Sequence, residues 1–228
     1  MKTLLVCKAL PDHGIPGGVE RHAENLIKGL KGRVDFVIAT TTGFPNREFL
    51  GFPVYRLGRK KGAIFDPWFQ EELQLLVRKL NVDIVHSEGF AAYSLAKKEG
   101  VPLMATIHVT DFTEKAFYLI CQPEKFAYRA YQLVKERLMG IRRMLKANLV
   151  VTVSRYAQSV IKMEYGREAR VIFNGVDTEK FKPGKEKAGE FTMLQVARLK
   201  KEKGVHVVLK ALKELKKVIP RNGYRFEV

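Results

Sequence analysis

Two glycines that could take part in chemistry, Gly17 and Gly18, lie directly before a run of helical periodicity in this 228-residue sequence. A helix start carries unpaired N–H groups and a partial positive charge, and glycine lets an anion approach that backbone closely. The pair therefore predicts a phosphate site, although a tight strand-to-helix turn would use the same residues. The G-x-G-x-x-G and Walker A patterns are absent, which argues against a dinucleotide-dependent oxidoreductase and against a P-loop NTPase.

A second candidate anion site lies near the end of the sequence, in VARLKKEKG at 196–204. Arg198 ends an apolar run, and Lys203 stands before the next run of helical periodicity. A pyrophosphate at that helix start would meet backbone N–H groups, a guanidinium fork and an ammonium group together. Solvated surface charge in a lysine-rich chain is the alternative explanation.

Histidines place polar groups at the ends of two further apolar runs. His108 ends one run, and His86 lies near the end of the preceding one. Each could contact a sugar or a phosphate, or could be a core histidine with its hydrogen bonds satisfied, and the sequence leaves both interpretations open. His13, His22 and His206 have no metal-ligand arrangement with cysteine or carboxylate residues, so we expect no metal site.

The composition indicates a basic globular protein. Lys and Arg number 41 against 24 Asp and Glu, a formal charge of +17. This excess favours contact with nucleic acid, acidic lipid or phosphorylated small molecules, or it reflects a solvated surface.

Cys7 and Cys121 form no zinc or disulfide pattern, which favours a reducing compartment. The apolar run at 3–6 is too short to cross a membrane and lacks a signal-peptide layout, so we expect a cytoplasmic protein.

These candidate residues lie between elements that alternate along most of the sequence. Apolar runs typical of buried parallel strands are separated by stretches of helical periodicity. The expected strands are 3–10, 34–41, 53–57, 82–87, 102–109, 149–154 and 169–176, and the expected helices are 18–30, 66–80, 90–100, 114–147 and 155–166. The order predicts an α/β fold, a Rossmann-like parallel sheet with helices on both faces.

Ligands of such sheets bind beyond the carboxyl ends of the strands. That edge should carry the loops 11–18, 88–89, 108–111 and 154–155. The first glycine pair and His108 therefore share one expected binding side.

A change of composition marks a domain boundary after residue 176. Residues 177–190 are polar and contain proline, glycine and four lysines, which indicates a linker. The strand, helix and strand pattern then restarts once, over 191–199, 205–219 and 224–228. We therefore expect a first domain at 1–176, the linker at 177–190 and an incomplete second Rossmann-like unit at 191–228.

The stretch 114–147 combines basic residues with interleaved aromatic and aliphatic residues. It predicts either a crossover helix whose apolar side is core, or a basic amphipathic helix on an anionic membrane surface. We expect no nucleic-acid partner, because no helix-turn-helix, RRM or zinc-finger pattern is present.

These motifs, in this order, resemble the glycosyltransferase 4 family. The matching segments are GGVERHAENLIKGL at 17–30, ATIHVTD at 105–111, VTVSRYAQSVI at 151–161, NGVDTEKFKP at 174–183 and VARLKKEKG at 196–204. Each segment alone is weak, whereas the combination is specific and covers essentially the whole chain.

The resemblance implies a GT-B fold with the active site between an N-terminal acceptor-side domain and a C-terminal donor-binding domain. It implies sugar transfer, with retention, from a nucleotide-diphosphate sugar to a sugar or lipid-linked acceptor, without a metal or cofactor. Arg198 and Lys203 match the basic pair that neutralises the donor diphosphate, and Gly17 and Gly18 match its glycine loop. The catalytic position beside the donor sugar matches His108.

Two further matches and two departures complete the comparison with that family. Glu20 and Arg21 match the acceptor side, Ala197 replaces a frequent glycine, and the paired glutamates of the second domain do not occur before Val228. We therefore expect a transferase fragment that is inactive alone, cytoplasmic, and peripheral at the inner face of the membrane if the basic stretch binds lipid. The alternatives are a non-catalytic acceptor- or anionic-lipid-binding module completed by a partner chain, and a nucleotide-sugar epimerase.

Overall fold

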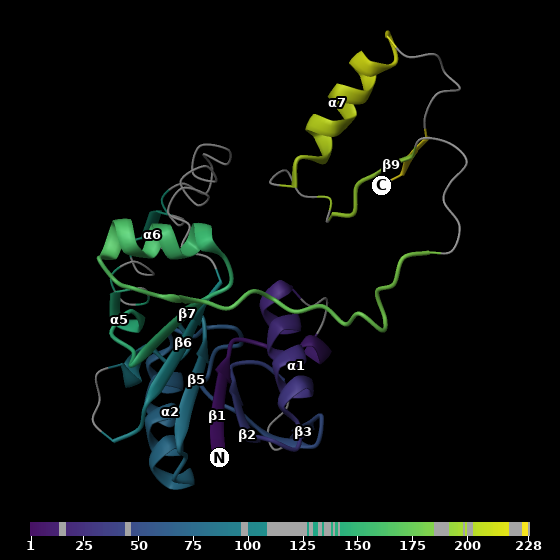
Figure 1. The fold of residues 1–228 in the computed structure, drawn as a ribbon. Coiled ribbons are helices and arrows are strands. Elements are labelled where there is room, and N and C mark those ends of the chain that lie inside the picture. Colours follow the sequence, from purple (N-terminus) through teal and green to yellow (C-terminus); the bar gives the residue numbers. More distant parts are fainter. Residues whose placement is uncertain are drawn as a thin grey trace. The chain divides into compact units, whose positions relative to one another are not determined.

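The structure, a computed structural model, forms two compact units, 1–175 and 176–228, which are described separately (Figure 1). The described residues are 1–13, 17–43, 47–96, 100–108, 127, 130–131, 134, 138, 140, 142–184, 192–197, 199, 203–218 and 225–227.

An eight-stranded sheet forms the first unit, in the order β3-β4-β2-β1-β5-β6-β7-β8. The strands are β1 (Lys2–Cys7), β2 (Asp35–Thr40), β3 (Arg47–Phe49), β4 (Phe52–Arg56), β5 (Ile84–Glu88), β6 (Leu103–Ile107), β7 (Leu149–Thr152) and β8 (Arg170–Val171). The seven predicted strands are present and parallel, which confirms the α/β fold. The unpredicted β3 pairs antiparallel with β4 at the edge.

Alternate residues of β1 supply the two halves of the core, as the two-residue period of a strand requires. Leu4 and Val6 pack in one cluster with residues of α2 (Pro67–Leu80). Leu5 and Cys7 pack in the other cluster, with residues of α1 (Gly18–Leu30). The two helices therefore cover opposite faces of the sheet, as Figure 1 shows.

The helix bounds follow local capping signals. Asp66 occupies the N-cap position of α2, and Pro67 is its first residue. In α6 (Arg155–Tyr165), the hydroxyl of Ser154 accepts a hydrogen bond from the amide of Ala157 at 3.1 Å. Gly166 ends that helix at φ +62°, a conformation that favours glycine. The three predicted helices at 18–30, 66–80 and 155–166 are thus confirmed.

The predicted helix at 90–100 is wrong for the residues that the structure describes there. A single 3-10 turn, η2 (Tyr93–Leu95), is present, and 97–99 lie outside the described residues. The amide of Ala92 donates to the Ser87 hydroxyl, and the Gln70 side chain binds the Ala91 carbonyl. In a continuous helix the Ala91 carbonyl would instead accept from the amide of Leu95, so the Gln70 side chain takes a backbone group that the helix would pair internally.

Other elements are shorter than expected. A 3-10 turn, η1 (Pro11–His13), follows β1, and the strand expected at 169–176 is limited to β8. Most of the predicted helix at 114–147, with Cys121, lies outside the described residues, and α5 (Arg142–Met144) is near its end.

In the second unit, β9 (Thr192–Leu194) pairs in parallel with β10 (Arg225–Glu227), and α7 (Val205–Leu215) lies between them in the chain. This is the strand, helix and strand order that the sequence predicts. Among the described residues of both units, none of the helices has the length and apolar character needed to cross a membrane.

Candidate functional site

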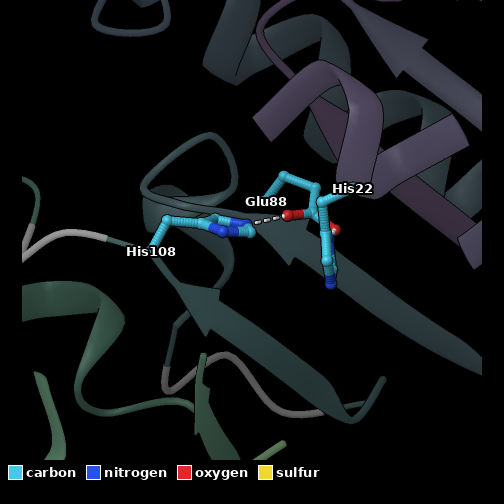
Figure 2. A group of neighbouring side chains, drawn as sticks. All are labelled: His22, Glu88 and His108. Atoms are coloured by element: carbon cyan, nitrogen blue, oxygen red, sulfur yellow. Dashed lines mark hydrogen bonds and ion pairs between the residues drawn. The ribbon is translucent and has the colours of Figure 1, made fainter. Parts of the chain in front are cut away.

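Three side chains from separate segments meet at the carboxyl edge of the sheet in the first unit. Glu88 is the last residue of β5, and His108 directly follows β6. Glu88 is held in register opposite Thr106 of β6, and His22 projects from α1. Figure 2 shows the carboxylate of Glu88 between the two imidazole rings.

Each oxygen of this carboxylate has its own imidazole partner. Oε1 of Glu88 lies 3.0 Å from Nδ1 of His22, and Oε2 lies 2.5 Å from Nε2 of His108. The rings of His22 and His108 are 4.7 Å apart between centroids. A third imidazole, that of His86, has Nε2 3.6 Å from Oε1 of Glu88 and 2.8 Å from the Thr106 hydroxyl.

The Glu88 side chain is fully buried, yet it is ionised at neutral pH. Burial acts to raise its pKa, but the hydrogen bonds from His108 and His22 outweigh burial and lower the pKa to about 2. An ionised carboxylate can only accept, so Nδ1 of His22 and Nε2 of His108 carry the donated protons. Nδ1 of a neutral His108 is then a hydrogen-bond acceptor. His86 is neutral at neutral pH, because burial lowers its pKa to about 4.

The predicted glycine pair begins α1, with Gly17 at the N-cap position and Gly18 as the first residue. The Gly17 amide donates to the carboxylate of Glu20 at 2.9 Å. A Cβ atom at residue 17 would lie 2.7 Å from Oε2 of Glu20. The chain's own carboxylate therefore occupies the helix start, and an external anion would have to displace Glu20 from the Gly17 amide.

The remaining predicted site residues lie elsewhere. Arg21 is 59% exposed and pairs with Glu24 of the same helix at 2.7 Å. Lys203 belongs to the second unit, is exposed, and precedes Gly204 at the N-cap of α7. Arg198 lies outside the described residues. Within the first unit, Gly17, Gly18 and Glu20 share one helix start, whereas His108 meets Glu88 and His22.

The partners of His108 were not predicted from the sequence. The expectation that His22 has no metal-ligand arrangement with a carboxylate is wrong, because its Nδ1 lies 3.0 Å from Oε1 of Glu88, 66 residues further along the chain. The sequence does predict that residues 88–89 lie at the ligand-binding edge of the sheet, and this position was the signal that could have identified Glu88 as a site residue. The periodicity of α1 indicates its buried face but not which strand end that face meets.

Chemically, the arrangement holds an imidazole in one orientation at a ligand-binding edge. The buried carboxylate fixes the tautomer of His108. His108 can therefore present a defined acceptor nitrogen, Nδ1, to a hydroxyl group. The two imidazoles and the carboxylate are also a possible metal donor set.

Known proteins similar to this chain support one family. Alpha-monoglucosyldiacylglycerol synthase of Acholeplasma laidlawii is 25% identical over 167 residues, which are 65% of this chain and 42% of that protein. Sucrose-phosphate synthase from Thermosynechococcus elongatus has a TM-score of 0.70 at 15% identity, over 99% of this chain and 61% of that chain. The catalytic domain of starch synthase IV from Arabidopsis thaliana, bound to ADP and acarbose, has a TM-score of 0.60 at 12% identity. That likeness covers 99% of this chain and 67% of that chain.

The two structural likenesses show the fold, and the chain spans about half the length of the curated relatives it matches. The sequence profile of Glycosyltransferase Family 4 matches residues 16–180. That span runs from the start of α1 through Glu88 and His108 to the region after β8. The chain therefore belongs to Glycosyltransferase Family 4.

Proposed function

We propose that the protein containing this chain transfers a sugar from a nucleotide-diphosphate sugar to an acceptor, with retention of anomeric configuration. The observation that carries the proposal is the position of His108, fixed by Glu88 at the ligand-binding edge of a Glycosyltransferase Family 4 domain. In this proposal, His108 forms a hydrogen bond with the donor sugar and stabilises charge that develops in the transition state.

The donor's diphosphate would be neutralised by Arg198 and Lys203, and Gly17 and Gly18 are further candidate residues for binding it. The support is the exposed ammonium group of Lys203 directly before the N-terminus of α7, where an anion is stabilised. A similar fold in starch synthase IV is bound to ADP, which supports a nucleotide in this role. We expect no metal requirement and no cofactor.

The acceptor is proposed to be a sugar or a lipid-linked molecule next to Glu20 and Arg21. Support for a lipid comes from the 25% identity to a protein named as a synthase of a glucosylated diacylglycerol. We expect no sugar transfer from the 228 residues alone, because they span 42% and 54% of the two curated relatives.

The test is a transfer assay on the natural protein that contains this chain, with UDP- and ADP-sugars and diacylglycerol or a simple sugar as acceptor. We expect product with the donor's anomeric configuration by NMR. His108→Ala should lower kcat on the order of 100-fold. Leu75→Ala, an exposed residue of α2, is the matched control and should leave kcat unchanged. Absence of donor consumption by the folded protein would refute the proposal.

A second candidate is a module that binds acceptor or anionic lipid without catalysis and is completed by a partner chain. The observation that favours it is the exposure of three apolar side chains within the basic stretch, Tyr131, Val134 and Leu138, at helical spacing. We expect vesicles rich in anionic lipid to bind the chain, and Val134→Ser with Leu138→Ser to weaken that binding. Met163→Ser, an exposed apolar residue of α6, is the control. If the chain floats equally well with neutral and with anionic vesicles, these three side chains do not form a surface specific for anionic lipid.

A further inference from the structure

We propose that His22, Glu88 and His108 form a binding site for one divalent transition-metal ion of the Zn2+ class. The site rests on the geometry of the three side chains and does not depend on the proposed sugar transfer, which does not require the ion. No spacing in the sequence indicates this site, because its donors come from three distant segments.

The donor atoms are of the right kind and nearly at the right separation. One nitrogen from each imidazole and one carboxylate oxygen all lie within 4.8 Å of one another. Ligands of Zn2+ lie about 2 Å from the ion, so two ligands of one ion are separated by about 3–4 Å. Movements of less than about 1 Å bring the three donors to that spacing. Two imidazoles with one carboxylate suit Zn2+ and its neighbours better than Mg2+ or Ca2+.

The backbone holds the three donors in place before any ion arrives. Glu88 is in register with β6, His108 directly follows that strand, and His22 precedes the buried Ala23 of α1. The fourth group nearby, His86, is already bonded to Thr106 and is 96% covered at its side chain, so it stays outside the ligand set. Ordered elements lower the conformational entropy that ligand binding would otherwise cost.

The site is partly exposed to solvent. The side chains of His22 and His108 are 20% and 10% exposed, whereas that of Glu88 is fully buried. Three protein ligands with an open side leave a coordination position for water or for an oxygen of a bound molecule. The site therefore resembles an exchangeable metal site more closely than a closed structural one.

Binding also has a defined proton balance. Nδ1 of His22 and Nε2 of His108 now donate protons to Glu88, and each must offer a lone pair to the ion. The proton of each neutral ring moves to its other nitrogen, no bond to carbon changes, and no oxidation occurs. Nδ1 of His108 then becomes a donor instead of an acceptor. If the proposed function holds, an ion would change which sugar atom His108 can bind.

The test is calorimetric titration of the untagged, metal-free chain with Zn2+, with Mg2+ as the comparison ion. We expect one Zn2+ per chain and no Mg2+ binding. Glu88→Gln and His22→Asn should each weaken Zn2+ binding on the order of 100-fold or more. His206→Asn, which changes an exposed histidine of α7, should leave it unchanged.

Two measurements keep this test decisive. Far-UV circular dichroism checks the fold of Glu88→Gln, and His22→Asn tests the site at a partly exposed helix position. Replacing Zn2+ by Co2+ should give visible absorption bands that both variants lose. Failure of the wild-type chain to bind Zn2+, or equal binding by both variants, would overturn the proposal, whereas failure of the sugar-transfer assay would leave it standing.

Discussion

Two buried carboxylates of the first unit have different kinds of partner. Asp66, at the start of α2, accepts hydrogen bonds from the backbone amides of Arg59 and Lys60 at 2.9 and 3.3 Å. Glu88, at the end of β5, is bound by two imidazole side chains. Burial acts to raise the pKa of each, and the hydrogen bonds outweigh it, so both pKa values are lowered.

The difference separates a carboxylate that holds backbone amides from one that holds two imidazole side chains. The partners of Asp66 are backbone amides, which do not depend on the identity of the side chains. By accepting from them, Asp66 holds the turn at 59–60 against the start of α2. Gly58 supports this docking, because its φ is +77° and a Cβ there would lie 2.8 Å from Cβ of Phe69. The partners of Glu88 can each be removed by one substitution, and they are groups that can also bind ligands.

The largest expected effect is that of Asp66→Ala. The change leaves the amides of Arg59 and Lys60 without their acceptor and removes the N-cap residue of α2. We expect a loss of about 3 kcal/mol in the free energy of unfolding, measured with urea. Asp35→Ala, an exposed carboxylate at the start of β2, is the control and should change little. A loss as small as that of the control would mean that the turn is not held by this carboxylate.

Glu88→Gln should lower the free energy of unfolding by about 2 kcal/mol, because two imidazole N–H groups lose a charged acceptor. The sharper measurement is the same change in a His22→Asn, His108→Asn background. There Glu88 is a buried charge without its two imidazole donors, so Glu88→Gln should become stabilising. No side-chain background can reverse the sign at Asp66 in this way. An unchanged sign at Glu88 would show that the histidines are not its stabilising partners.

Acid tests the same carboxylate without mutation of its partners. The pKa of Glu88 is about 2 when folded, below the ordinary 4.5, so its contribution to stability is present above pH 4.5 and is lost as the pH falls toward 2. The advantage of the wild type over Glu88→Gln in the free energy of unfolding, measured with urea, should lose most of its value between neutral pH and a pH of about 3. A constant difference would contradict the lowered pKa.

The fold could be predicted where the signal is local. Asp66 and Pro67 mark the start of α2 and the apolar runs mark the seven parallel strands, because caps and periodicity act over a few residues. The three-residue β3 carries no apolar run, so the sequence did not indicate it. The expected helix at 90–100 failed because a glutamine of α2, Gln70, binds that segment from 21 residues away.

The candidate site was predicted only in part for a related reason. The sheet rule placed residue 88 and His108 at the same edge, but it does not determine how far α1 is rotated about its axis. That rotation brings His22 to Glu88, and it depends on the packing of Ala23 and Ile27 against the sheet. Contacts fixed by such packing have no local signature in the sequence.

The smallest expected effect on stability comes from Glu24, a carboxylate that also has two partners but whose partners are much more exposed than those of Glu88. Like Glu88, Glu24 has one partner for each oxygen, with Arg21 and Lys28 both at 2.7 Å. Its pKa is lowered chiefly by the hydrogen bond from Lys28. Both cationic side chains are more than half exposed, so water competes for each and salt screens the pairs. Glu24→Gln should therefore cost less than about 0.5 kcal/mol in urea unfolding, and the cost should vanish at high salt. A loss equal to that of Glu88→Gln would show that the number of partners, and not the exposure of those partners, determines what such a carboxylate contributes.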